Sequence, residues 1–358
     1  MGVSERRSEL SWQNLAFCAM VLFIHCSSQP VSALRTDSWQ FALVYVLQKL
    51  SFVSVYGFFL LSGVKLTLPR GRRISVALYY KGRLKSILLP YFIAMLIYYV
   101  WFSAALGYIQ PSAGSFLGYL VRGDLSSPFY FIVALTQLIV LMPLLRYVAE
   151  HVSPALSLPL ALAVSWMSEL YFEQFLQLFD PFASFAYGDR VFTTYLFYYL
   201  AGCYIGLHYD AFLSALRRNR RFTSGVFALF AAFDAALSYR GRVLSLWSPL
   251  WPMAHLTYLL AAIAFCFLAA SSIRRPLPRW LAQVDRASFL IYLYHALVIS
   301  VLDQKILGRI GVSGVAVPYA IRIAVVFVLV PLGCVTWQNL WAAVWQKVSK
   351  KYRSGETI

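Results

Sequence analysis

Long apolar segments recur along the whole chain and constrain its fold more than any other feature. Hydrophobic residues make up 60% of the 358 residues, charged residues only 13%, and the mean hydropathy is +0.67. A soluble protein of this length has no core large enough to bury so much apolar surface. We therefore predict an all-α, polytopic integral membrane protein in which each long apolar segment crosses the bilayer as a helix.

The apolar segments predict about ten transmembrane helices within a single domain that covers residues 1–358. The expected spans are 11–30, 43–64, 87–106, 128–145, 152–169, 191–209, 222–239, 249–270, 287–304 and 316–344. When the spans alternate in direction and the N-terminus is cytoplasmic, most of the 31 Lys and Arg residues fall on the cytoplasmic side, as the positive-inside rule requires. We therefore expect both termini, as short tails over 1–10 and 345–358, to be cytoplasmic.

The distribution of charge and the spacing of the cysteines predict which partners and sites the chain lacks. The formal net charge is +17, but the basic residues lie in loops between apolar segments and not on a soluble module, so we predict contact with the lipid bilayer and no nucleic-acid partner. The five cysteines all lie in apolar segments without metal-binding spacing, which predicts neither a metal site nor a disulfide framework. The sequence gives no indication of the oligomeric state.

The first span contains an ionisable residue, His25, well past its middle. If the helix enters from the cytoplasm near Leu10, His25 lies roughly 22 Å along it, in the outer half of a hydrocarbon core about 30 Å thick. Ionisable residues are costly in a membrane and commonly face a bundle interior or a wet cavity, where they have a function. A histidine at the outer interface, solvated or bonded to a backbone carbonyl, is an equally good interpretation of the position alone.

Few other ionisable residues lie within the predicted spans. Asp234 lies in the seventh span, His255 and Asp303 lie near outer ends, and His295 lies in the middle of the ninth span. A transporter would use such groups as a proton relay, and an enzyme would use them as a base and its orienting partner. Each residue alone is more commonly a packed or interfacial polar group, but two mid-membrane histidines together favour a function.

The second cytoplasmic loop, residues 65–85, carries seven cations and no acidic residue. These charges fit a topological role, in which they hold the loop inside and contact anionic headgroups. They would also suit the phosphates of an anionic cosubstrate, because Lys and Arg form charge-assisted hydrogen bonds with phosphate oxygens. Lys81, Arg83 and Lys85 directly precede the third span and are the candidates for this second role.

Six segments share a recognisable pattern in their order and spacing. They are the first span with His25, FFLLSG at 58–63, YYKGRLKSILLPY at 79–91, SPFYFIVALTQLIVLMPLLR at 127–146, YLFYYLAGCYIG at 195–206 and SFLIYLYH at 288–295. In this pattern the chain resembles acyltransferase family 3, the bacterial integral-membrane O-acyltransferases that act on surface glycans. Two positions depart from the family. The family usually has Arg or Lys at the position that ten residues separate from the histidine, and this chain has Asn14 there. The family often has a second Arg three positions after the first, and this chain has Ser86 three positions after Arg83.

The resemblance implies a membrane-bound O-acyltransferase of the bacterial cytoplasmic membrane. Such an enzyme would move an acyl group, most often acetyl, from cytoplasmic acyl-CoA to a hydroxyl of a polysaccharide or lipid-linked glycan at the outer face. Acetyl-CoA would then be the donor, and no metal is expected. The resemblance implies that His25 is the base or acyl acceptor and that Asn14 orients the inner end of the His25 side chain. Lys81, Arg83 and Lys85 would bind the CoA phosphates. Ser62, Tyr130 and His295 would contact the substrate.

Two other functions stay open on the sequence. The first is a transporter or flippase for a lipid-linked glycan, which predicts paired intramembrane acids and bases, whereas the middles of these spans hold few acids. The second is a catalytically silent relative that acts as a partner in glycan assembly. Its best support is Asn14, because an amide supplies no charge where the family has a cation.

Overall fold

The described part of the chain is built from helices. The computed structural model describes residues 7–68, 75–179, 184–246, 248–273, 275–309 and 314–354, and every regular element in these ranges is helical, which confirms the expected all-α class. Eight of these helices are long and apolar enough to cross a membrane, and the number is nine if the bent pair Ala113–Arg122 and Ser127–Val140 counts as one span. Residues 1–6 and 355–358 of the predicted tails, and 69–74 of the basic loop, lie outside the described residues.

The count falls short of ten at the expected span 191–209. There the chain forms a short 3-10 helix, η6 (Phe192–Tyr195), followed by α10 (Leu196–Leu207). The 12 residues of α10 cover about 18 Å, which is less than the thickness of the hydrocarbon core. Most of α10 is buried, and a short helix enclosed by protein does not need to span the bilayer alone.

The expected span 128–145 also differs, because the chain bends before it and the helix is broken within it. The preceding helix α6 (Ala113–Arg122) ends at Gly123, whose φ of 64° is left-handed, and the chain turns by 62° into η3 (Ser127–Phe129) and α7 (Tyr130–Val140). A new helix, α8 (Met142–His151), starts after Leu141, with Pro143 in its first turn. Glycine tolerates left-handed backbone and proline favours helix starts, so both breaks are encoded locally.

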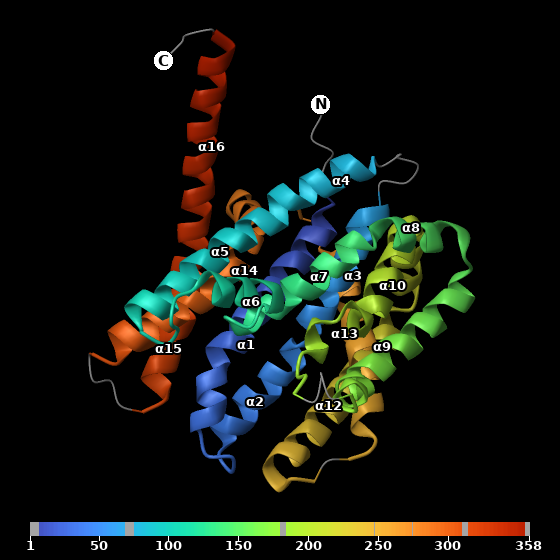
Figure 1. Cartoon of the computed structure of the whole chain (residues 1–358). Coiled ribbons are helices and arrows are strands. Elements are labelled where there is room, and N and C mark those ends of the chain that lie inside the picture. Colours follow the sequence, from blue (N-terminus) through green and yellow to red (C-terminus); the bar gives the residue numbers. More distant parts are fainter. Residues whose placement is uncertain are drawn as a thin grey trace. The chain divides into compact units, whose positions relative to one another are not determined.

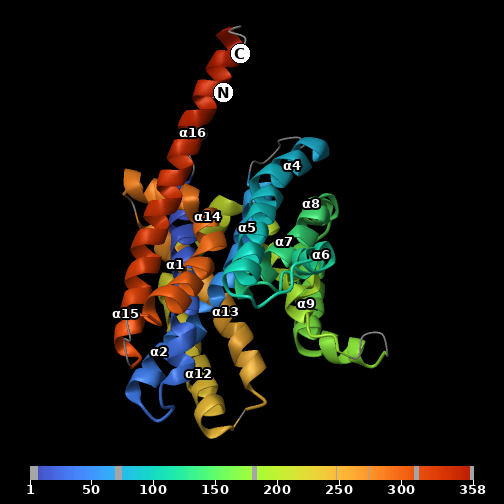
Figure 2. The same ribbon diagram turned by 60° about the vertical axis from the view of Figure 1, so that its left-hand side comes forward.

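The chain divides into two compact units, where the sequence predicts a single domain. One unit comprises Met1–Ser51 and Arg274–Ile358, and the other comprises Phe52–Ile273. The first unit therefore joins segments from opposite ends of the sequence, which are the dark blue and the orange to red helices of Figures 1 and 2.

The first unit contains two long helical stretches that include π-helical turns. Its elements are α1 (Ser8–Ala33), α2 (Trp39–Ser51), α14 (Arg279–Val301), η7 (Leu302–Leu307), α15 (Ala316–Ala324), η8 (Val325–Leu329) and α16 (Val330–Ser354). α14 continues into the π-helical η7, and α15 continues through the π-helical η8 into α16, so much of the expected C-terminal tail is helical. α1 packs against α2, α14 and α15, and π-helical turns in such helices are frequent at functional sites.

The second unit is organised around close packing of α3 on α10. Its further elements are α3 (Val53–Thr67), α4 (Val76–Arg83), η1 (Leu84–Leu88), α5 (Leu89–Val100), η2 (Trp101–Ala105), α9 (Pro154–Gln177), η5 (Gly188–Arg190), α11 (Tyr209–Arg218), α12 (Arg220–Leu244) and α13 (Trp251–Ser272). A Cβ atom on Gly63 of α3 would clash with the Tyr199 carbonyl, and one on Gly202 of α10 would clash with the Leu60 carbonyl. Small residues at these positions allow the two backbones to approach closely, as in other membrane helix pairs.

Candidate active site

Two helices of the first unit bring His25 and His295 together. The centroids of the two imidazole rings are 5.0 Å apart, and the ring planes are inclined by 53°. His25 on α1 is half-buried, whereas His295 on α14 is completely buried. The two mid-membrane histidines of the sequence are therefore neighbours, although 269 residues lie between them in the chain.

The hydrogen bonds of His295 determine its tautomer. Its Nδ1 atom lies 2.7 Å from the carbonyl oxygen of Tyr292 and 3.2 Å from that of Ile291. Carbonyl oxygens only accept hydrogen bonds, so Nδ1 must carry the proton, and in the neutral ring Nε2 carries a lone pair. Nε2 is buried and has no hydrogen-bond partner among the described residues. A buried, unpartnered acceptor is rare in proteins and requires an explanation, of which a catalytic role is one.

A second polar cluster lies one helical turn beyond His25. Arg322 on α15 donates from Nη1 to the side-chain oxygen of Gln29 (2.9 Å) and from Nε to Asp303 Oδ1 (2.7 Å). The Arg322 side chain is only 6% exposed, and a guanidinium buried to this degree requires such partners. Asp303 lies in the π-helical η7, so the cluster joins α1, α15 and the continuation of α14 beside the histidine pair.

The side chain of Asn14 contacts α14 and does not reach His25. Asn14 precedes His25 by eleven positions on the same helix, which is about 16 Å, so its side chain cannot touch the imidazole. Instead Asn14 Nδ2 donates to Asp285 Oδ1 (2.7 Å) and to Ser288 Oγ (2.9 Å) of α14, and Ser11 Oγ donates to Asp285 Oδ2 (2.8 Å). The Asn14 amide therefore joins α1 to α14, and an orienting role for Asn14 toward His25 stays a prediction.

The three cations predicted to bind CoA phosphates lie in the second unit, on α4 and η1. Lys81 and Lys85 are exposed, whereas Arg83 is half-buried, with its guanidinium carbon 5.0 Å from the centre of the Tyr79 ring. The Tyr80 hydroxyl donates to the Val140 carbonyl oxygen (2.8 Å), which ties α4 to α7. The segment is thus held in place while its lysine ammonium groups stay accessible to an anion.

Two residues predicted to bind substrate also lie in the second unit. Ser62 Oγ donates to the carbonyl oxygen of Phe58 (2.8 Å), one turn earlier on α3, so its proton is already used within the helix. Tyr130 is half-buried at the first position of α7. A substrate-binding role for Ser62 and Tyr130 stays a prediction.

Comparison with known proteins identifies the family. A sequence model of the acyltransferase 3 family, described as an acyltransferase domain, matches residues 15–337. The chain belongs to this family. It is accordingly a multi-pass membrane acyltransferase, as the motifs around His25 and His295 predict. The searches of curated proteins and of solved structures found no match.

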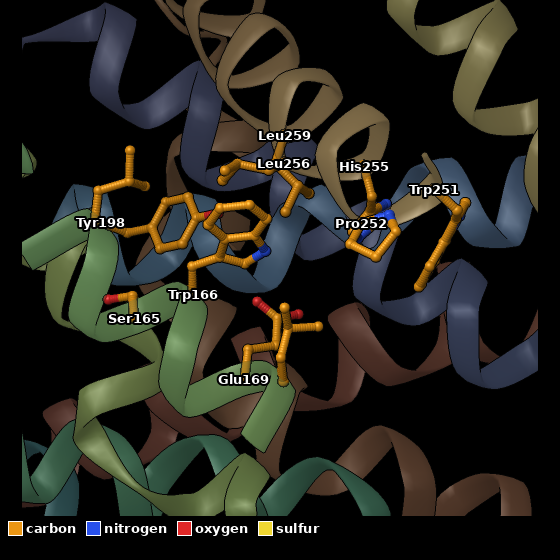
Figure 3. Close-up of a pocket in the computed structure, with 11 residues that line it drawn as sticks. Ser165, Trp166, Glu169, Tyr198, Trp251, Pro252, His255, Leu256 and Leu259 are labelled. Atoms are coloured by element: carbon orange, nitrogen blue, oxygen red, sulfur yellow. The ribbon is translucent and has the colours of Figure 1, made fainter. Parts of the chain in front are cut away.

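The second unit of this acyltransferase also contains a small cavity with an acid–base pair of its own (Figure 3). Helices α9, α10 and α13 line the cavity, with Trp166 and Glu169 facing His255 in the close-up. His255 Nδ1 lies 3.1 Å from Oδ1 of the fully buried Asp234. The cavity volume of about 40 Å³ holds a few water molecules but not a sugar or a CoA arm, so we assign no catalytic role to it.

Arg322 and Asp285 are polar site residues that the sequence interpretation missed. Arg322 stands within the apolar run 316–344 and could have been found as an intramembrane cation. Asp285 precedes Arg286 near the start of a span and therefore resembles an ordinary loop charge. Its burial follows from the packing of α1 on α14, for which the local sequence gives no signal.

Proposed function

We propose that this acyltransferase moves an acyl group, acetyl in the simplest case, from cytoplasmic acyl-CoA to a hydroxyl of a polysaccharide or lipid-linked glycan at the outer face of the bacterial cytoplasmic membrane. The observation that carries the proposal is the contact between His25 and His295 within the membrane-spanning helices. An imidazole is the usual general base for activating a hydroxyl near neutral pH.

In this mechanism His25 is the base, because it is the more exposed ring of the pair. His295 has its proton on Nδ1, so its Nε2 can only accept and can take a hydrogen bond from an N–H of His25. The other nitrogen of His25 then carries a lone pair and faces the acceptor hydroxyl. In this arrangement His295 positions His25, in the way that a carboxylate orients the base of a hydrolase triad.

The chemical step balances with these two rings. The acceptor oxygen attacks the thioester carbonyl carbon while His25 takes the hydroxyl proton, which gives a tetrahedral intermediate and an imidazolium. Collapse of the intermediate breaks the carbon–sulfur bond, and His25 returns the proton to the leaving sulfur, which departs as CoA thiol. The buried Arg322, which is paired with Asp303, supports the proposal because it bonds to Gln29 and so anchors the turn of α1 that follows His25.

Acyl-CoA binding is proposed on the charge of the basic segment. The 3′-phosphate and diphosphate of CoA carry several negative charges, and Lys81 and Lys85 present exposed ammonium groups on one helical segment. Arg83 would contribute a planar donor, held by the ring of Tyr79.

The test is acyl-CoA turnover by the purified full chain, followed as release of free thiol. We expect His25→Ala to abolish release, and His151→Ala to leave it unchanged because His151 is an exposed histidine on α8. Acyl-CoA binding is measured on the same samples, since an absent acceptor would prevent turnover without preventing binding. A wild-type protein that neither binds nor turns over acyl-CoA would contradict the proposal and favour a transporter or a silent partner in glycan assembly.

A further inference from the structure

A groove lined by arginines and apolar side chains lies between α12 and α13 in the second unit. Its volume is about 540 Å³, within the range of ligand sites. Its lining includes Arg220, Arg221 and Ser224 of α12, and Phe265, Leu268 and Ala269 of α13. Neither the proposed acyl transfer nor the predicted CoA contacts involve these residues.

The groove lies at the end of two membrane-spanning helices. Arg220 is the first residue of α12 and Leu268 lies in the last two turns of α13, and both helices are long and apolar enough to cross a membrane. The groove is therefore at the level where such helices leave the hydrocarbon core. Phe265 extends the apolar wall of the groove toward the middle of the membrane. Its ring stacks on that of Phe227, with the ring centroids 4.3 Å apart.

The cations of the groove have no counter-charge. Arg220 and Arg221 are exposed, and neither forms an ion pair or a hydrogen bond among the described residues. The sequence contains no acidic residue between Asp210 and Asp234. The neighbouring Arg217 differs, because it donates to the hydroxyl and carbonyl oxygens of Ser271 and so secures α11 on α13.

We propose that this groove binds an anionic glycerophospholipid of the surrounding bilayer. The lipid phosphate would lie between Arg220 and Arg221, with Ser224 as a neutral donor, and an acyl chain would follow Phe265 and Leu268 into the membrane. A cationic rim with an apolar wall directed inward matches a molecule that is charged at one end and apolar along its length. A soluble phosphate compound would use only the rim.

The test compares binding of phosphatidylglycerol and phosphatidylcholine with identical acyl chains to the delipidated full chain, by native mass spectrometry from detergent. We expect Arg220→Ala/Arg221→Ala to weaken phosphatidylglycerol binding by about 25-fold, since each of the two cations near the headgroups contributes on the order of a fivefold gain. Phosphatidylcholine binding should not change. The control is Arg240→Ala/Arg242→Ala, which removes two exposed cations from the other end of α12.

A second variant tests the apolar wall without changing the charge. Ala269→Phe adds a ring inside the groove, and we expect it to weaken phosphatidylglycerol binding as well, because the acyl chain loses its space. Equal losses in the Arg220/Arg221 and Arg240/Arg242 variants would overturn the proposal, since charge alone would explain them. Displacement of the lipid by excess CoA would also overturn it and assign the groove to a soluble phosphate compound.

Discussion

The imidazole of His295 can be tested one nitrogen at a time. An Asn amide reaches the position of Nδ1 and can keep the hydrogen bond to the Tyr292 carbonyl, but it places nothing at Nε2. We therefore expect His295→Asn to fold like the wild type and to lower turnover of acyl-CoA by about 10²–10⁴-fold, the range for groups in acid–base catalysis. Thiol release and the unfolding temperature are measured on the same preparation.

The matched variant is His295→Gln, whose longer side chain places its amide oxygen near Nε2 and gives up the bond from Nδ1. We expect it to retain more turnover than His295→Asn and to unfold at a lower temperature. If the Asn variant turns over as fast as the wild type, Nε2 has no part in the reaction and the assignment of His295 as a positioning residue is wrong.

Asn14 offers a separate test, because it occupies the family's usual cation position. Asn14→Ala removes a donor from the buried carboxylate of Asp285, and we expect a loss of about 1–3 kcal/mol in stability. Asn14→Lys places an ammonium opposite Asp285 and should keep the link between α1 and α14. Unfolding temperatures of the three proteins measure this difference, and an Ala variant as stable as the wild type would show that the link contributes nothing.

Single residues were predictable where their chemistry is unusual for a membrane. His25 and His295 could be singled out because ionisable groups in apolar segments are costly. Their pairing could not be predicted, since it depends on the packing of α1 against α14 from the far end of the chain. For Asn14, the distance along a helix already excludes a direct contact with His25, because the two residues lie three turns apart.

The packing of α3 on α10 depends on positions that hold no side chain. We expect Gly202→Ala to destabilise the protein by roughly 1–3 kcal/mol, because the new methyl group would overlap the Leu60 carbonyl and force the helices apart. The hydrogen bond from Thr67 Oγ1 to the Cys203 carbonyl (2.7 Å) would be stretched as well. The measurement is thermal unfolding in detergent, followed by intrinsic tryptophan fluorescence.

Gly225→Ala is the matched control for this substitution. Gly225 is also helical, on α12, but an added Cβ would meet nothing within 4 Å. Since Ala is the better helix former in this open position, the control should be as stable as the wild type or slightly more stable. Equal destabilisation by both substitutions would show that close packing of α3 and α10 is not what Gly202 provides.

Elements were predictable where a long apolar run stands alone. The first span and the spans at 222–239 and 249–270 correspond to α1, α12 and α13, because their composition and length leave no other stable structure in a membrane. The run at 191–209 has the same composition but forms the short α10, since the surrounding helices of its unit cover it. Hydropathy cannot distinguish burial in lipid from burial in protein.

At the scale of the whole molecule, the number of crossings and the location of the termini constrain each other. Eight crossings leave both ends on one side of the membrane, nine leave them on opposite sides, and ten return them to the same side. The basic segments favour an even number with both ends in the cytoplasm. The number of crossings would be odd if the bent pair 113–140 crossed the membrane fully and α10 did not cross it. Most of the Lys and Arg residues after residue 210 would then lie outside the cell, against the positive-inside rule.

Reporter fusions in a bacterial host test this prediction. We expect a fluorescent protein fused after residue 358, and one inserted after Asn219 in the basic segment between α11 and α12, to report the cytoplasm, because translocating either cluster of cations is unfavourable. An alkaline phosphatase inserted in the short connection 245–250 should be active, because α12 separates this connection from the basic segment by one crossing. An alkaline phosphatase fused after residue 358 should be inactive. If it is active while the fluorescent protein at Asn219 reports the cytoplasm, the number of crossings after α11 must be odd.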